Sequence, residues 1–192
     1  MIAICGLGAI GSHIAKNLVF AGYNDLLLID KDKVEARNYQ FGTQLYEPEQ
    51  LGKNKTEALW FNIFRQTNVV VTNRNIDISQ MLKKQNFQDI SLLVDCLDNH
   101  EARKATSAIG KDMKIPVLHV GFSPVFTYQI QWDKNYETPS DVKGHFDICE
   151  MQGARAFIEY VSGLATNVLI DYLKSGTLIS LIGNKYSVTQ IK

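Results

Sequence analysis

A glycine-rich motif near the start of the chain, Gly6-Leu7-Gly8-Ala9-Ile10-Gly11, has the spacing of a phosphate-binding loop. It follows the apolar run Ile2–Cys5 and opens a stretch with helical periodicity. In such a loop Gly6 permits a tight turn, Gly8 lets the backbone approach a phosphate, and Gly11 allows the helix to pack closely on the strand. The unpaired N–H groups at the start of that helix favour an anion. The motif therefore predicts a site for the phosphates of a nucleotide.

Asp30 is the second candidate, because it follows the apolar run Leu26–Ile29 at about 20 residues beyond the glycines. A carboxylate at this point accepts hydrogen bonds from the hydroxyls of a ribose. The glycines and Asp30 together predict an adenine nucleotide. They do not separate two classes of enzyme, since a nicotinamide-dependent dehydrogenase and an enzyme that uses ATP both need this arrangement.

Further motifs follow in order, and each contains side chains suited to nucleotide chemistry. They are Asp30-Lys31-Asp32-Lys33-Val34 with Asn38, the loop residue Gln44, the segment Gly52-Lys53-Asn54-Lys55, and the segment Asp95-Cys96-Leu97-Asp98-Asn99. A dehydrogenase leaves Lys55 and Asp98 unexplained, and 192 residues give little room for a separate substrate domain. The motifs therefore favour an enzyme that uses ATP, with an NAD-dependent oxidoreductase as the less favoured alternative.

In this order the motifs resemble those of the ThiF/MoeB/HesA family, the adenylating enzymes related to the ubiquitin-activating enzymes. The resemblance covers roughly residues 1 to 125, with a looser similarity in the helical stretch Ala154–Leu173. It implies ATP- and Mg²⁺-dependent adenylation of a C-terminal carboxylate, usually the Gly-Gly end of a small ubiquitin-like or sulfur-carrier protein. A carboxylate oxygen must then attack the α-phosphate while pyrophosphate leaves, so the site needs positioning and charge neutralisation more than a strong base.

The resemblance also implies roles for residues around the nucleotide. Asp30 is expected to hold the ribose, and Asp32 belongs to the same acidic motif. Asn38 is expected to bind the nucleotide near its ribose and phosphates, and Gln44 is the loop glutamine of the family pattern. These residues join Gly6, Gly8 and Gly11 as the expected nucleotide-binding set.

Three residues are expected to take part in the chemistry itself. Lys55 matches the family lysine that neutralises the phosphates, with Lys53 as the alternative register. Asp98 is expected to hold Mg²⁺, which prefers carboxylate and phosphate oxygens. Cys149 lies where some relatives carry a cysteine that takes the activated acyl group or sulfur, although a small packing residue explains it as well.

One family residue is missing from the sequence. The family places an arginine that contacts the outer phosphates just before the loop glutamine, whereas Thr43 precedes Gln44 here. Arg37 and Arg65 are the candidates to replace it. The departure supports an alternative in which the chain is a non-catalytic or degenerate subunit that needs a partner chain for activity.

The composition is that of a globular protein without a general attraction to nucleic acid or membranes. The chain has 20 Lys+Arg, 20 Asp+Glu and 45% hydrophobic residues, and no apolar run approaches the length of a membrane span. Its cysteines, Cys5, Cys96 and Cys149, are odd in number and widely spaced. They predict neither a disulfide framework nor a zinc site, so we expect a cytoplasmic protein. ATP and Mg²⁺ are the cofactors that the family resemblance implies. Relatives commonly dimerise, and a homodimer or heteromer is expected.

The elements that must position these residues alternate along the chain. Strands are predicted at Ile2–Cys5, Leu26–Ile29, Val69–Thr72, Ser91–Cys96, Val117–Val120 and Thr127–Trp132. Helices are predicted at Ser12–Ala21, Lys53–Gln66, Ile78–Asn86, His100–Met113 and Ala154–Leu173. Long loops are predicted at Lys31–Gln50 and Asp133–Asp147, and a hairpin at Leu178–Ile191 that turns at Gly183-Asn184.

This alternation predicts a doubly wound, Rossmann-like α/β fold whose sheet is mostly parallel, with an antiparallel part at the C-terminus. The length fits one domain. Residues 1–125 are expected to form its nucleotide-binding core, and residues 126–192 an extension with a crossover loop, a long helix and the hairpin.

Overall fold

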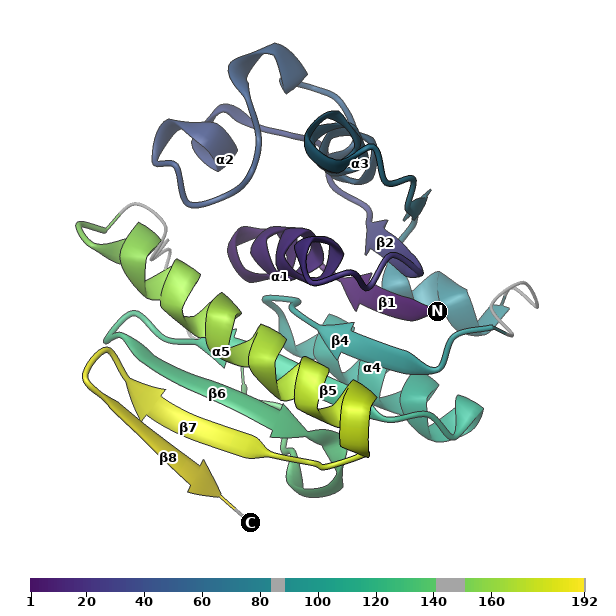
Figure 1. Cartoon of the computed structure of the whole chain (residues 1–192), viewed down its shortest axis with the longest axis vertical. Coiled ribbons are helices and arrows are strands. Elements are labelled where there is room, and N and C mark those ends of the chain that lie inside the picture. Colours follow the sequence, from purple (N-terminus) through teal and green to yellow (C-terminus); the bar gives the residue numbers. More distant parts are fainter. Residues whose placement is uncertain (84–88, 141–150, 192) are drawn as a thin grey trace.

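The computed structural model describes residues 1–83, 89–140 and 151–191, which form one eight-stranded sheet in the order β3-β2-β1-β4-β5-β6-β7-β8 (Figure 1). The strands are β1 (Ile2–Cys5), β2 (Leu26–Asp30), β3 (Thr72–Asn75), β4 (Leu92–Asp95), β5 (Val117–Phe122), β6 (Thr127–Trp132), β7 (Ser180–Asn184) and β8 (Ser187–Ile191). Strands β1 to β5 pair in parallel, and β6, β7 and β8 are added in antiparallel fashion. The predicted fold class is confirmed. The division of the chain at about residue 125 stays a prediction.

Helices cover both faces of this sheet. They are α1 (Ala9–Phe20), α2 (Ala36–Gln40), α3 (Lys55–Thr67), α4 (His100–Met113) and α5 (Ala154–Ser175), with short 3₁₀ helices η1 (Pro48–Gln50), η2 (Ile78–Lys83) and η3 (Asp133–Asn135). Helices α1, α3 and α5 pack on one face, while α4 and η2 pack together on the other (Figure 1). Among the described residues, no helix combines the length and apolar character needed to span a membrane.

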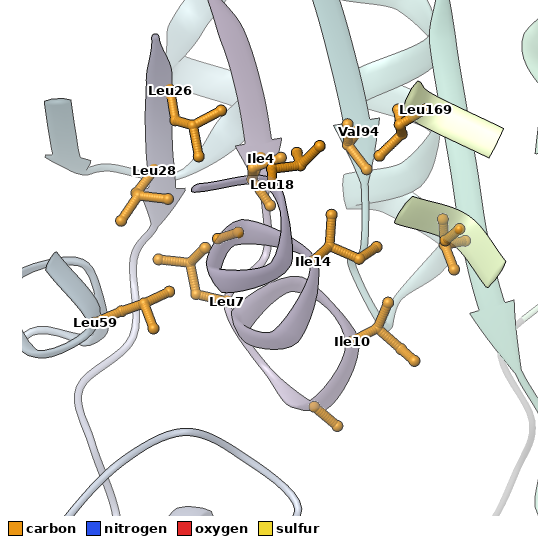
Figure 2. Packing of buried hydrophobic residues seen from close by; sticks show 14 of the residues in the cluster. Ile4, Leu7, Ile10, Ile14, Leu18, Leu26, Leu28, Leu59, Val94 and Leu169 are labelled. Atoms are coloured by element: carbon orange, nitrogen blue, oxygen red, sulfur yellow. The ribbon is translucent and has the colours of Figure 1, made fainter. Parts of the chain in front are cut away.

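The central strands are apolar up to their last residues, which allows both of their faces to be buried. Strands β1 and β4 are fully buried, and their side chains alternate between two core clusters. Ile4 and Val94 point to the face of α1, where they meet Ile14 and Leu18 (Figure 2). Burial of this cluster fixes α1 over the end of β1, and thereby the loop between them.

Two predicted boundaries were wrong at the edges of the sheet. The third strand lies at Thr72–Asn75 and not at Val69–Thr72. Asn68 ends α3 in the left-handed conformation with φ 58°, and Val70 remains 69% exposed, so β propensity alone did not set the register. The edge strand pairs with β2 through polar residues instead.

The final hairpin turns two residues later than predicted, at Lys185–Tyr186. The Asn184 side chain accepts a hydrogen bond from the Tyr186 N–H at 2.8 Å and so closes the turn from its first residue. Gly183 lies inside β7, where a Cβ would stand 2.1 Å from the Ser187 carbonyl oxygen. Gly183 therefore allows β7 and β8 to lie close together and does not form the turn.

The long loop predicted at Lys31–Gln50 contains short helices. Helix α2 begins after Glu35, whose N–H donates to Asn38 Oδ1 at 2.8 Å, and η1 begins after Glu47, whose N–H donates to Gln50 Oε1 at 3.0 Å. Both are capping boxes with glutamate at the first position. Periodicity misses such helices because they are shorter than two turns.

Candidate nucleotide-binding site

The candidate site lies at the carboxyl ends of β1, β2 and β4. Cys5, the last residue of β1, is in register with Ile29 on β2 and with Asp95 on β4. The chain runs from β1 to β2 and β3 on one side and returns to β4 and β5 on the other. Ligands bind at such switch points in open α/β sheets, because loops diverge there and leave a crevice. Asp30 is the last residue of β2, and the predicted glycines and Asp98 follow the ends of β1 and β4.

The glycine loop is packed tightly at two of its three glycines. Gly6 has φ 87°, and a Cβ there would lie 2.9 Å from the Cys96 carbonyl oxygen. A Cβ on Gly11 would lie 1.9 Å from the Gly6 carbonyl oxygen. Gly8 differs, because a Cβ there would meet nothing within 4 Å. The protein itself fills the space at Gly6 and Gly11, whereas Gly8 faces open space.

The start of α1 is suited to an anion. Gly8 is the N-cap, no side chain caps the helix, and no acidic residue stands in its first turn. The first N–H groups of an α-helix have no partner within the helix and carry a partial positive charge. Together with the open space at Gly8, this arrangement fits a phosphate group.

Asp30 is buried, with 8% of its surface exposed, and holds the glycine loop in place. Its Oδ2 accepts the Leu7 N–H at 2.7 Å, and its Oδ1 accepts the Asp32 N–H at 2.8 Å. Burial raises the pKa of Asp30, while the Lys55 charge and the two N–H donors oppose that rise. The Asp30 carboxylate thus supports the glycine loop through Leu7.

Tyr46 also supports the loop, and the sequence analysis missed it. Its hydroxyl donates to the Leu7 carbonyl oxygen at 2.6 Å. Burial raises the pKa of Tyr46 well above its usual range, so the hydroxyl stays a donor at ordinary pH. Leu7 is therefore held on its N–H by Asp30 and on its C=O by Tyr46. No sequence signal marks a contact between residues this far apart.

The two lysines of the alternative registers lie in different surroundings. Lys55 is 8% exposed, and its Nζ lies 3.5 Å from Asp32 Oδ2, beside the buried Asp30. Lys53 is exposed and lines a separate cavity of about 440 Å³ with Trp60. The structure thus brings Lys55, and not Lys53, to the acidic motif.

Asn38 and Gln44 lie in the segment between β2 and α3. Asn38 is buried, and its Oδ1 is occupied by the capping contact to Glu35. Gln44 lines a cavity of about 260 Å³, and its buried Oε1 has no partner among the described residues. Tyr46 lines the same cavity and contacts Leu7, so this cavity and the glycine loop share a wall.

Asp98 stands in the turn between β4 and α4. It is exposed, and its Oδ1 accepts a 3.2 Å hydrogen bond from Asn99 Nδ2. Asn99 caps α4 by accepting the Ala102 N–H at 2.9 Å. Among the described residues, no group of three His, Cys, Asp or Glu side chains could hold a metal. A single carboxylate fits Mg²⁺ that arrives on nucleotide phosphates and not a site made by protein alone.

The arginines proposed to replace the missing one are both engaged with glutamates. Arg37 Nε lies 2.7 Å from Glu35 Oε2, and Arg65 forms an ion pair with Glu47. A third, Arg155 on α5, lies against Gly42 and lines the cavity that contains Gln44. Cys149 lies outside the described residues.

Comparisons with known proteins agree with this geometry. The model of the ThiF family matches residues 1–191. Ubiquitin-like modifier-activating enzyme 5 of Drosophila mojavensis is 32% identical over 135 residues, which are 64% of this chain and 33% of that protein. The enzyme of the same name from Caenorhabditis elegans is 32% identical over 118 residues, or 55% of this chain and 28% of that protein. The chain thus spans about a third of the length of these relatives.

Solved structures share the fold. A crystal structure of E. coli MccB with AMPCPP and MccA has a TM-score of 0.77 at 14% identity, covering 100% of this chain and 63% of that one. A structure of PaaA has a TM-score of 0.75 at 19% identity, with 100% and 63% coverage. Both the family match over almost the whole length and the arrangement of glycine loop, Asp30 and Lys55 lead to one assignment. The chain belongs to the ThiF family.

Proposed function

We propose that the chain is an ATP- and Mg²⁺-dependent adenylyltransferase that activates the C-terminal carboxylate of a small protein or peptide. The observation that carries this proposal is the open space at Gly8, above an uncapped helix start and next to Asp30. This space fits phosphate, and Asp30 and Lys55 supply an acceptor for ribose and a cation for the phosphates.

Each residue has a task that follows from its surroundings. The N–H groups at the start of α1 bind phosphate oxygens, and Asp30 orients the ribose. Lys55 sits against Asp32 in a position with little exposure, so its charge is held at the crevice by the fold. Its ammonium neutralises charge that develops as pyrophosphate leaves. Mg²⁺, bound through Asp98 and the phosphates, would add further charge neutralisation.

The proposed substrate is the C-terminus of a small ubiquitin-like or sulfur-carrier protein, or of a peptide. The curated relatives are named as activating enzymes of a ubiquitin-like modifier, and MccB has been crystallised with MccA and with ATP. The chain spans a third of the first and under two thirds of the second. A homodimer or a complex with a second chain is part of the same proposal.

The experiment that tests the nucleotide site compares Lys55, which lies beside Asp32, with Lys53, which is exposed and lines a separate cavity. Thermal unfolding is followed with Mg·ATP, with ATP and chelator, and with NAD⁺. We expect stabilisation by Mg·ATP, because a ligand at 100 times its dissociation constant adds about 2.7 kcal/mol. Lys55→Met should remove most of this shift, and Lys53→Met should retain it. Stabilisation by NAD⁺ alone, or equal loss in both variants, would contradict the proposal.

Activity is tested by ATP–pyrophosphate exchange with candidate carrier proteins and peptides. The engagement of Arg37 and Arg65 with glutamates favours a second candidate, a nucleotide-binding subunit that depends on another chain. The two candidates differ in one outcome. Exchange by the purified chain supports the adenylyltransferase, whereas exchange that appears only after a second polypeptide is added supports the dependent subunit.

A further inference from the structure

A buried polar cluster lies on the face of the sheet that α4 covers, at the carboxyl end of β4, three residues before Asp98. Asp95 Oδ2 lies 2.6 Å from His119 Nδ1 and 3.6 Å from Arg103 Nη1. Arg103 donates to the Tyr136 hydroxyl at 3.2 Å, and the Tyr136 ring stacks on His119 at 3.6 Å between centroids. Asp95 and His119 are almost fully buried. Asp95 opens the motif Asp95-Cys96-Leu97-Asp98-Asn99, whereas His119 and Tyr136 lie outside the motifs that resemble the family.

The second oxygen of Asp95 connects this cluster to the candidate magnesium ligand. Asp95 Oδ1 accepts the Leu97 N–H at 3.0 Å, and Leu97 directly precedes Asp98. On the other side of Asp98, Asn99 caps α4. Both oxygens of Asp95 thus accept a hydrogen bond, one from the Leu97 N–H and one from His119. The contact with His119 therefore sets the orientation of the Asp95 carboxylate toward the turn that contains Asp98.

Burial of Asp95 and His119 restricts the orientation of the Asp95 carboxylate. Buried polar groups that lose a partner are expensive to leave unsatisfied, so each member of the cluster keeps the others in place. Although burial alone would lower it, the pKa of Arg103 is raised above its ordinary value by Asp95 and Tyr136. Arg103 therefore remains a permanent cation beside Asp95.

The cluster also contains a serine, but its geometry does not fit acyl transfer. Ser107 Oγ lies 3.4 Å from His119 Nε2, which extends the line from Asp95 through His119. Ser107 stands in the middle of α4, and its Oγ bonds the Arg103 carbonyl at 3.3 Å. N–H groups within a helix are already paired, so the backbone of α4 around Ser107 offers no free donor for an oxyanion. The Asp95–His119 pair therefore needs another explanation.

We infer that Asp95 and His119 are positioning residues for Asp98: His119 fixes the Asp95 carboxylate, which holds the Leu97 N–H and so presents Asp98 to nucleotide-bound Mg²⁺. This inference rests on the proposed function. Partners behind a metal ligand typically change metal affinity by about 10- to 100-fold when they are removed.

The test is a magnesium titration of the purified chain at fixed ATP, read by thermal unfolding. His119→Leu removes the donor to Asp95, and we expect the Mg²⁺ concentration for half of the stabilisation to rise about 10-fold. ATP with chelator should stabilise the variant as it does the wild type. His119→Asn, whose amide can replace Nδ1–H, should restore most of the magnesium response. Ser107→Ala is the matched control, since it touches the same ring without touching Asp95, and should leave the titration unchanged.

A second measurement, made without nucleotide or Mg²⁺, tests the contact between Asp95 and Leu97 independently of the titration. Hydrogen exchange at the Leu97 amide should accelerate in His119→Leu and not in Ser107→Ala. If His119→Leu does not fold, Asp95→Asn takes its place, because an amide offers one acceptor oxygen where Asp95 uses two. An unchanged titration or unchanged Leu97 exchange in a folded variant would overturn the inference alone. A wild-type chain without any magnesium-dependent stabilisation would overturn the proposed function, and the inference with it.

Discussion

Gly11 lies so close to Gly6 that a Cβ on Gly11 would stand 1.9 Å from the Gly6 carbonyl oxygen. An alanine has no side-chain rotation that moves its Cβ, and the atom that the Cβ meets belongs to the backbone, so only a shift of the backbone relieves the overlap. Gly11→Ala should therefore move α1 off the end of β1 and lower the free energy of unfolding by several kcal/mol, on the order of the strongest core substitutions. Urea unfolding measures this. A variant as stable as the wild type would show that the loop is not packed in this way.

Gly8→Ala should behave in the opposite manner. A Cβ at Gly8 meets nothing within 4 Å, and φ is −75°, so stability should fall by no more than about 1 kcal/mol. The methyl group would occupy the space assigned to phosphate, and the Mg·ATP-dependent rise in melting temperature should be largely lost. Retention of that rise would place the phosphates elsewhere.

Tyr46→Phe should destabilise the protein because it removes the hydroxyl that donates to the Leu7 carbonyl. The change leaves the Leu7 carbonyl without its 2.6 Å donor in a buried place, which costs about 1–3 kcal/mol. The melting temperature should fall by several degrees. Tyr186→Phe is the control, since Tyr186 is 85% exposed and its hydroxyl adds little. Equal effects of the two substitutions would show that the Tyr46 hydroxyl does not support the loop.

His13 should make stability depend on pH. Burial lowers its pKa below the ordinary value, with Lys16 and Arg155 acting in the same direction and Glu159 and the Thr43 backbone against it. Between the lowered pKa and about 6.5 the unfolded chain binds more protons than the folded one, so stability is lost as the pH falls through that window.

The check on His13 is a comparison of wild type with His13→Gln across pH 5 to 8, a range chosen to include the ordinary histidine pKa of about 6.5. Glutamine does not titrate, so the stability of the variant relative to the wild type should improve toward the acid end. A constant difference across the range would mean that His13 titrates alike in both states.

Much of the fold followed from the order of apolar runs and glycines in the sequence. Helix α4 and strand β6 occupy the predicted residues, because each has a clear period and a clear boundary such as Asn99. The third strand and the last turn were misplaced, since at Val70 and Gly183 exposure and close strand contact outweighed local propensity.

The site was predictable only where local motifs describe it. The glycines and Asp30 are recognisable from spacing, and Lys55 from the family resemblance. The glycines follow β1, Asp30 ends β2, and Lys55 begins α3 beside Asp32. Tyr46 and His119 could not be found in this way. Their roles depend on contacts with Leu7 and Asp95, which are made only after folding brings distant segments together.

The contact between Gly6 and Cys96 also bears on how the chain matures during synthesis. The glycine loop is synthesised before β4, yet one wall of it is the Cys96 carbonyl, and the Cys96 N–H donates to the Cys5 carbonyl oxygen at 2.8 Å. Pairing of such distant segments is slow, because the chain between them must first lose its freedom. The nascent chain therefore cannot complete this loop until β4 has been translated and has paired with β1.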